Sequence, residues 1–189
     1  MKLLGFERSI ADAVSQLDLR LPPEASILDA GCGTGVIGLA LMRHSARSTL
    51  VATDMSPELL QHAKRNAAAQ GIDERRVRLG VSDISRPGVV APVEGSGTLP
   101  IEAFDVVATG AVIGYARDQE DALHALLDLV KTDGCFLAGR LTSRRYRYSS
   151  MPLSRMERVI ERKGFDVTRM PVKTFPARLT RTCLVARRG

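Results

Sequence analysis

Residues 27–41, ILDAGCGTGVIGLAL, place four glycines within eight positions between two apolar runs. Glycine suits sharp left-handed turns and close backbone approach, so the segment predicts a strand, a tight loop and a helix in succession. Read from Gly33 to Gly38, the spacing is G-x-G-x-x-G, which is typical of a dinucleotide-binding turn. Read from Asp29, it is an acidic residue followed by glycines at every second position. The two patterns predict different cofactors.

Strands and helices alternate along the rest of the chain. We expect strands at 26–31, 48–54, 76–83, 103–110, 135–141, 165–172 and 180–188. We expect helices at 8–19, 35–44, 57–70, 119–130 and 154–164, and a long loop at 85–102. Alternation predicts an α/β fold in which helices cover both faces of a mostly parallel sheet, and the last two strands predict a hairpin that adds one antiparallel strand.

Local signals mark several helix ends. Ser56 followed by Pro57 predicts an N-cap and a first helical residue. SRME at 154–157 has the spacing of a capping box, and Gly164 follows that helix. Gly134, after the helix at 119–130, suits a left-handed C-terminal position.

The length of 189 residues predicts one domain, with an N-terminal helix and linker at 1–23, a core at 24–140 and a basic part at 141–189. No apolar run approaches the ~20 residues that a membrane span needs, and no secretory signal is recognised, so we expect a cytoplasmic protein. The three cysteines lack metal-ligand spacing, and no metal is expected.

Positive charge is concentrated at the C-terminus. Residues 140–189 hold 14 Lys and Arg against 3 Asp and Glu, whereas residues 1–139 hold 13 against 18. Such a segment is usually a solvated surface, but it also suits attraction to an acidic small molecule or to RNA. Aromatic residues make up only 4% of the chain, so few side chains are available to stack on RNA bases.

Asp29 discriminates between the two cofactor classes. A carboxylate at the end of the first strand repels a phosphate, by roughly 1 kcal/mol in water at ~4 Å and about 4 kcal/mol at an effective dielectric of 20. S-adenosylmethionine has no phosphate, and its sulfonium and ammonium are both positive. Asp29 therefore favours S-adenosylmethionine over a dinucleotide.

Two further acids end the next two strands. Asp54 suits the ribose hydroxyls of either cofactor, and Asp83 suits an adenine amino group. Met55 and Ile84, each next to one of these acids, are placed to sandwich the adenine ring. Each residue alone has a structural explanation, as a helix cap, a turn or a core residue. Three acids after three successive strands are harder to explain by packing.

ILDAGCGTG, VATDMSPELLQHAKRNA, LGVSDI and FDVVAT resemble, in this order, the motifs of class I S-adenosylmethionine-dependent methyltransferases, from about residue 24 to 140. The resemblance implies a Rossmann-like, seven-stranded, mostly parallel sheet with helices on both faces and one antiparallel strand near the C-terminal edge. It also implies S-adenosyl-L-methionine as cofactor. The candidate cofactor-binding residues are Asp29, Gly31, Cys32, Gly33, Gly35, Asp54, Met55, Asp83, Ile84 and Thr109.

The methyl acceptor is less constrained, because transfer from a sulfonium needs alignment more than a catalytic group. After the fourth strand, ATGAVIGYARD lacks the Asn/Asp-Pro-Pro-aromatic pattern of methyltransferases that act on base amino groups or glutamine. It resembles the segment of small-molecule O-, N- and C-methyltransferases, and VIGY resembles some magnesium-protoporphyrin methyltransferases, whose substrate is acidic. Tyr115 is a candidate catalytic residue, and Arg144, Arg145 and Arg147 are candidate substrate ligands.

Three functions stay open. The first is a methyltransferase for a small, acidic metabolite. The second is an RNA or protein methyltransferase that docks through its Arg-rich end. The third is a non-catalytic cofactor-binding subunit that a partner chain completes, since no insertion is large enough to cap the site. A monomer or a homodimer is expected, without membrane association.

Overall fold

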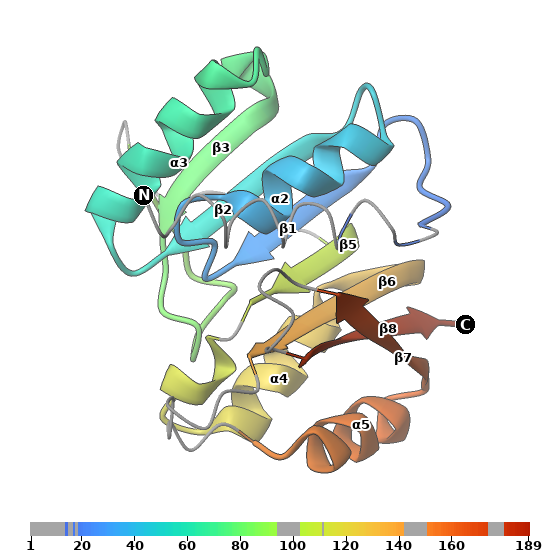
Figure 1. The fold of residues 1–189 in the computed structure, drawn as a ribbon. Helices are drawn as coiled ribbons and strands as arrows, with labels where there is room; N and C mark the ends of the chain where they lie inside the picture. Colours follow the sequence, from blue (N-terminus) through green and yellow to red (C-terminus); the bar gives the residue numbers. More distant parts are fainter. Residues whose placement is uncertain are drawn as a thin grey trace.

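One eight-stranded sheet organises the fold (Figure 1). The structure, a computed structural model, describes residues 14, 17, 19–93, 103–110, 112–141, 151–173 and 180–189. The strands are β1 (Ser26–Ala30), β2 (Thr49–Asp54), β3 (Val77–Val81), β4 (Ala91–Pro92), β5 (Phe104–Thr109), β6 (Val130–Leu141), β7 (Phe165–Lys173) and β8 (Thr180–Arg188). Their order across the sheet is β4-β3-β2-β1-β5-β6-β8-β7.

Strand direction confirms the predicted fold class. The central strands β3, β2, β1, β5 and β6 are parallel, and β8 runs antiparallel between β6 and β7. The eighth strand, β4, was not expected, because its two residues lie within the predicted loop at 85–102 and pair antiparallel with Gly80 and Val81 of β3. The carboxyl ends of β1, β2, β3 and β5 therefore meet at one edge of the sheet.

Helices cover both faces of the sheet. They are α2 (Val36–Leu41), α3 (Pro57–Ala69), α4 (Gln119–Asp128) and α5 (Leu153–Arg162), with single 3₁₀ turns η1 (Met42–His44), η2 (Glu74–Arg76) and η3 (Ile113–Tyr115). In β1, Ile27 packs with residues of α2 and α3, whereas the next residue, Leu28, packs with residues of α4 and α5. This alternation separates two apolar clusters, and Figure 1 shows the two helix pairs beside different parts of the sheet.

The ends of α3 follow the sequence signals. The Ser56 hydroxyl accepts a hydrogen bond from the Leu59 amide at 3.3 Å, and Pro57 is the first helical residue. Gly71 has a φ of 68° directly after the helix. The cap leaves a short turn at Met55 and Ser56 between Asp54, the last residue of β2, and α3.

Two predicted helix signals are wrong. Gly134 does not end α4, which stops at Asp128, and the left-handed residue is Asp133 with a φ of 62°. Gly134 lies within β6, where a Cβ would be 2.9 Å from the Lys131 carbonyl oxygen. The register with β5 jumps there from Val130 to Cys135, so glycine serves an irregular strand rather than a helix end.

The predicted capping box of α5 is also absent. The N-cap is Pro152, which makes no side-chain bond, and the helix begins at Leu153. Glu157 pairs instead with Arg169 of β7. Gly164, with a φ of 82°, follows the helix as expected.

Some sequence predictions fall on parts that the structure leaves undescribed. They are most of the helix at 8–19, the second half of the loop at 85–102, and the Arg-rich residues 142–150. Among the helices that the structure describes, none is long and apolar enough to span a bilayer.

Candidate functional site

Three glycines shape the loop between β1 and α2. Gly31, Gly33 and Gly35 have φ angles of 70°, 55° and 83°. A residue with a Cβ pays roughly 1–2 kcal/mol for each such left-handed position. The alternate glycines of the sequence motif are therefore a requirement of the loop backbone itself.

The space around these glycines differs. A Cβ on Gly31 would lie 2.4 Å from Cγ2 of Val112, and one on Gly35 would lie 3.1 Å from Cβ of Ala63 in α3. A Cβ on Gly33 would meet no described atom within 4 Å. Neighbouring side chains thus pack against two of the glycines, while no described side chain packs against Gly33.

Asp29 lies beneath the loop rather than on its lip. Its side chain is fully buried, and Oδ2 accepts a hydrogen bond from the Gly38 amide of α2 at 2.8 Å. Oδ1 has no hydrogen-bond partner among the described residues. The pKa of Asp29 is raised to about 7, mainly by burial and in part by the nearby Asp54, while the hydrogen bond from the Gly38 amide opposes the shift.

Gly38 is a residue whose role the sequence patterns did not assign. A Cβ there would lie 3.0 Å from Cβ of Asp29 and 2.8 Å from Cδ1 of Leu50. Only glycine lets α2 approach β1 and β2 this closely and deliver its amide to the carboxylate. The third glycine of G-x-G-x-x-G therefore serves helix–strand packing and the buried acid.

Asp54 ties the loop to the end of β2. Its Oδ2 accepts from the Gly33 amide and its Oδ1 from the Ser56 amide, both at 2.9 Å. The Cys32 amide also donates to the Thr53 carbonyl at 2.8 Å, so the loop rests on β2 at two points. The carboxylate is only half-buried, and each oxygen keeps a further lone pair for a ligand hydroxyl.

The two predicted adenine contacts have different surroundings. Met55 is 65% exposed beside Asp54, whereas Ile84 is 7% exposed and packs in the cluster formed with α4 and α5. Asp83, between β3 and Ile84, is exposed, and its Oδ1 accepts from the Ser85 amide at 2.8 Å. Met55 and Asp83 present free surface, while Ile84 holds its turn against the core.

The segment after β5 borders the same edge of the sheet. Thr109 is 1% exposed, and its hydroxyl donates to the Ala30 carbonyl at 3.0 Å, which joins the ends of β5 and β1. Tyr115 in η3 is 66% exposed. The Arg117 amide donates to the Ser85 hydroxyl at 3.3 Å, so this segment lies beside the turn that carries Asp83. The predicted ligands Arg144, Arg145 and Arg147 lie outside the described residues.

Asn66 of α3 is a second residue that sequence reasoning missed. Its side-chain amide donates to the Thr34 carbonyl in the glycine loop at 3.0 Å. The signal was available, because Asn66 lies between Ala63 and Ala67 on the buried face of an otherwise regular helix. A polar residue at that position indicates a specific partner across the packing surface.

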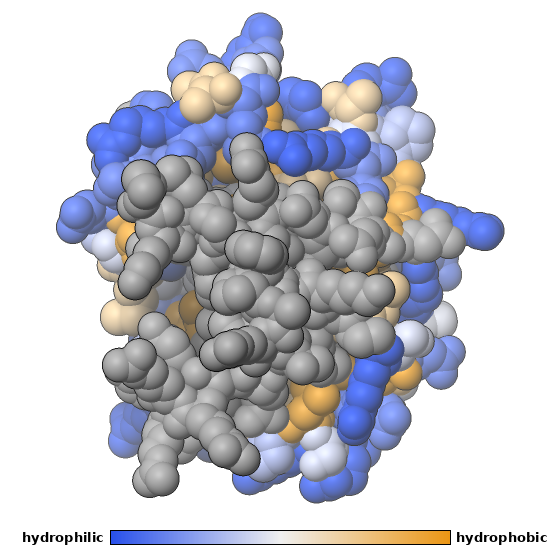
Figure 2. All heavy atoms as spheres, in the orientation of Figure 1, coloured by the Kyte–Doolittle hydropathy of each residue, from blue (hydrophilic) through white to orange (hydrophobic). Residues whose placement is uncertain are grey.

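Described cations of the basic C-terminal part are largely paired. Arg155 and Arg162 both contact Glu120, Lys163 contacts Asp128 at 2.5 Å, and Arg169 contacts Glu157. The view in Figure 2 shows mainly hydrophilic side chains on the coloured surface, with scattered hydrophobic patches. Within the described ranges, these four cations are thus already paired with acids of α4 and α5.

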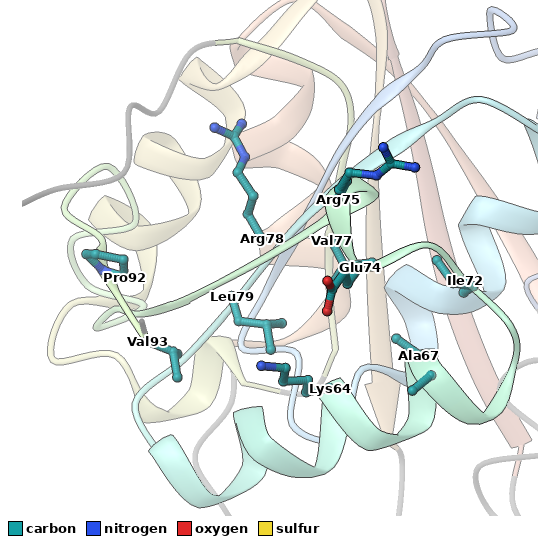
Figure 3. Close-up of a pocket in the computed structure, with 11 residues that line it drawn as sticks. Lys64, Ala67, Ile72, Glu74, Arg75, Val77, Arg78, Leu79, Pro92 and Val93 are labelled. Atoms are coloured by element: carbon teal, nitrogen blue, oxygen red, sulfur yellow. The ribbon is translucent and has the colours of Figure 1, made fainter. Parts of the chain in front are cut away.

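A separate groove of about 440 Å³ opens between α3, β3 and β4 (Figure 3). Its lining is mostly apolar and includes Leu79 and Val93, with Lys64 and Glu74 from facing elements. It follows the first half of β3 and the turn before it, toward the amino ends of the strands. None of the acids or glycines described above lines it, so it is distinct from the site at the carboxyl ends.

Comparison with known proteins assigns the fold to a family. The model of a family described as "Methyltransferase domain" matches residues 28–136, more than half of the chain. The chain belongs to this methyltransferase family. S-adenosylmethionine is the cofactor of such a domain, and the match spans the glycine loop and all three strand-end acids.

Individual relatives agree with this assignment. A release factor glutamine methyltransferase of Mycolicibacterium smegmatis is 28% identical over 107 residues, 57% of this chain and 36% of that protein. A ubiquinone biosynthesis O-methyltransferase of Salmonella paratyphi A is 31% identical over 108 residues, 57% of this chain and 39% of that protein. The matched region thus spans little more than a third of either relative.

A solved structure supports the fold over nearly the whole chain. Magnesium protoporphyrin IX methyltransferase from Synechocystis, with bound SAH, superposes with a TM-score of 0.72 at 15% identity. The alignment covers 98% of this chain and 84% of that one. At this identity the similarity shows the fold of the methyltransferase domain.

The residues of the site fit S-adenosylmethionine. No described atom lies within 4 Å of a Cβ on Gly33, and the buried Asp29 below the loop has one oxygen without a described partner, which suits a positive charge nearby. The described groups that shift the pKa of Asp29 include no cation.

Proposed function

We propose that this chain transfers the methyl group of S-adenosylmethionine to an oxygen, nitrogen or carbon atom of a small, acidic metabolite. The observation that carries the proposal is the arrangement at the carboxyl ends of β1 and β2. The glycine loop is held by Asp54 at 2.9 Å and lies over Asp29, whose Oδ1 has no partner among the described residues. This arrangement favours a cationic, phosphate-free cofactor.

The chain's own residues would bind and orient the cofactor, which supplies a methyl group already activated by its sulfonium. Asp54 would accept hydrogen bonds from the ribose hydroxyls through its remaining lone pairs, and Asp83 would accept one from the adenine amino group. The exposed Met55 would cover the ring. Gly31, Cys32, Gly33 and Gly35 would border the methionine portion, with Asp29 below them.

The acceptor would lie beside the segment after β5. Tyr115 is exposed there, on a 3₁₀ turn joined to the Asp83 turn through Arg117 and Ser85. We propose that its hydroxyl contacts the acceptor, and that Arg144, Arg145 and Arg147 bind an acidic group of the substrate. The buried Thr109 and Ile84 would support the segment after β5 and the Asp83 turn from the core side.

Activity is tested by incubating the chain with methyl-labelled S-adenosylmethionine and paired acceptors, each offered as the free carboxylate and as the neutral methyl ester. We expect label transfer to the carboxylate member of a pair. Tyr115→Phe should lower kcat for that acceptor while leaving the Kd of S-adenosylmethionine unchanged. Saturable cofactor binding with no transfer to any acceptor would favour the non-catalytic alternative instead.

A macromolecular acceptor is the second candidate, because one of the two relatives described above is named as a release factor glutamine methyltransferase. The segment TGAVIGY at 109–115 argues against this candidate, because it lacks the Asn/Asp-Pro-Pro-aromatic pattern. The ion pairs of Arg155, Arg162 and Arg169 also argue against it, because these cations already have acidic partners. Binding of RNA that weakens steeply between ~50 and ~200 mM salt would favour an RNA acceptor. Label transfer to a purified release factor would favour a protein acceptor.

A further inference from the structure

Asp29 is a buried acid, and one of its two carboxyl oxygens has no hydrogen-bond partner among the described residues. We propose that binding of S-adenosylmethionine releases a proton from Asp29, so that cofactor affinity depends on pH near neutrality. The inference rests on the proposed cofactor site and adds to it a coupled ionisation within the protein.

The geometry favours a neutral carboxyl group before the cofactor binds. An ionised carboxylate removed from water needs several donors, and Asp29 receives one described hydrogen bond, from the Gly38 amide to Oδ2. The side chain has no exposed surface, and burial raises its pKa to about 7. A large fraction of the molecules therefore carries a proton on Asp29 at neutral pH.

The charged and titratable neighbours act in the same direction. Asp54, at the end of β2, raises the pKa of Asp29 by repulsion between carboxylates. The Cys32 thiol of the loop is itself buried, and its pKa is raised well above its ordinary range by burial and by both acids. The facing helix α2 has the sequence VIGLAL and contributes the Gly38 amide but no charged side chain.

S-adenosylmethionine would reverse this balance by bringing positive charge to the loop above Asp29. Attraction to a cation favours the ionised carboxylate, so the O–H bond of Asp29 breaks and the proton passes to solvent. A phosphate-bearing ligand would do the opposite and hold the proton in place. The direction of proton exchange therefore reports the charge of the bound ligand.

The test is titration calorimetry at pH 7 in two buffers that differ in ionisation enthalpy. The ligands are S-adenosylmethionine, S-adenosylhomocysteine, which keeps only the ammonium, and methylthioadenosine, which has neither positive group. We expect proton release with S-adenosylmethionine and none with methylthioadenosine. Release with S-adenosylhomocysteine as well would attribute the effect to the ammonium, whereas its absence would attribute it to the sulfonium.

Two matched variants locate the proton. Asp29→Asn should abolish the release, and Asp73→Asn should preserve it. Asp73 is the exposed N-cap of η2, and its hydrogen bonds with Arg75 lower its pKa to about 2, so it stays ionised at neutral pH. In the unaltered chain, the Kd should also rise about tenfold for each pH unit below the pKa of Asp29.

The possible failures are distinguishable. S-adenosylmethionine that binds without proton exchange, and with a Kd independent of pH between 5 and 8, would overturn the inference and leave the proposed function standing. Undetectable binding of S-adenosylmethionine at every pH would instead overturn the proposed function.

Discussion

The carboxyl groups at the proposed cofactor site and those around α4 and α5 have different hydrogen-bonding partners. Around β1 and β2, Asp29 and Asp54 accept hydrogen bonds from backbone amides and keep unused acceptor capacity. Around α4 and α5, Glu120, Asp128 and Glu157 face arginines and lysines. A carboxylate bound to backbone amides can still accept from a ligand, whereas one paired with cations is already neutralised. The comparison supports placing the proposed cofactor site in the first half of the chain.

The largest effect predicted from this difference is the pH dependence of stability in the ligand-free chain. Because the folded state holds the Asp29 proton more tightly than the unfolded state, the free energy of unfolding should fall as pH rises from about 4 to about 7. The loss should reach roughly 4 kcal/mol from Asp29. Denaturant unfolding at successive pH values should show a shallower slope in Asp29→Asn, and equal slopes would contradict the prediction.

A second, smaller effect concerns the packing of the glycine loop. Gly31→Ala should lower the free energy of unfolding by about 3 kcal/mol, because it combines a left-handed residue with a Cβ only 2.4 Å from Val112. Gly33→Ala shares the backbone strain without the contact and should cost about 1–2 kcal/mol. The difference between the two variants therefore measures the cost of the steric contact with Val112.

The assignment to Val112 has its own check. The double variant Gly31→Ala with Val112→Ala should recover part of the loss, measured as a double-mutant cycle in denaturant unfolding. Strict additivity of the two substitutions would mean that Val112 is not the group that excludes a side chain at Gly31.

A third prediction tests the clamp between α3 and the loop. Asn66→Ala removes the 3.0 Å hydrogen bond to the Thr34 carbonyl and should cost about 1 kcal/mol of unfolding free energy. Calorimetry should also show a weaker affinity for S-adenosylmethionine, because the loop is less well held. A fall in stability with an unchanged Kd would limit Asn66 to a structural role.

The smallest effect is expected in the C-terminal half. Glu120→Gln weakens ion pairs with Arg155 and Arg162, whose side chains are 57% and 67% exposed. Solvent and salt screen such pairs, so thermal unfolding should shift only slightly and the shift should shrink at high salt. A decrease as large as that of Gly31→Ala would mean that the two halves do not differ in the way proposed.

The sequence determined much of the architecture and predicted where the cofactor site lies. Alternating apolar segments specified a mostly parallel sheet with one antiparallel strand near its C-terminal edge, because each segment carries its own periodicity. Ser56 and Pro57 likewise marked the start of α3 through local chemistry. The acids after successive strands pointed to the carboxyl edge, since parallel strands bring their ends together.

The tertiary structure decided what depends on neighbours distant in the chain. Gly134 and the SRME segment looked like helix signals, yet the irregular pairing of β5 with β6 and the Glu157–Arg169 ion pair overrode them. The sequence placed Asp29 at the end of β1, but it did not predict that the side chain is fully buried. That depth depends on how closely α2 packs on β1, which Gly38 permits, and burial is what makes this carboxylate sensitive to charge.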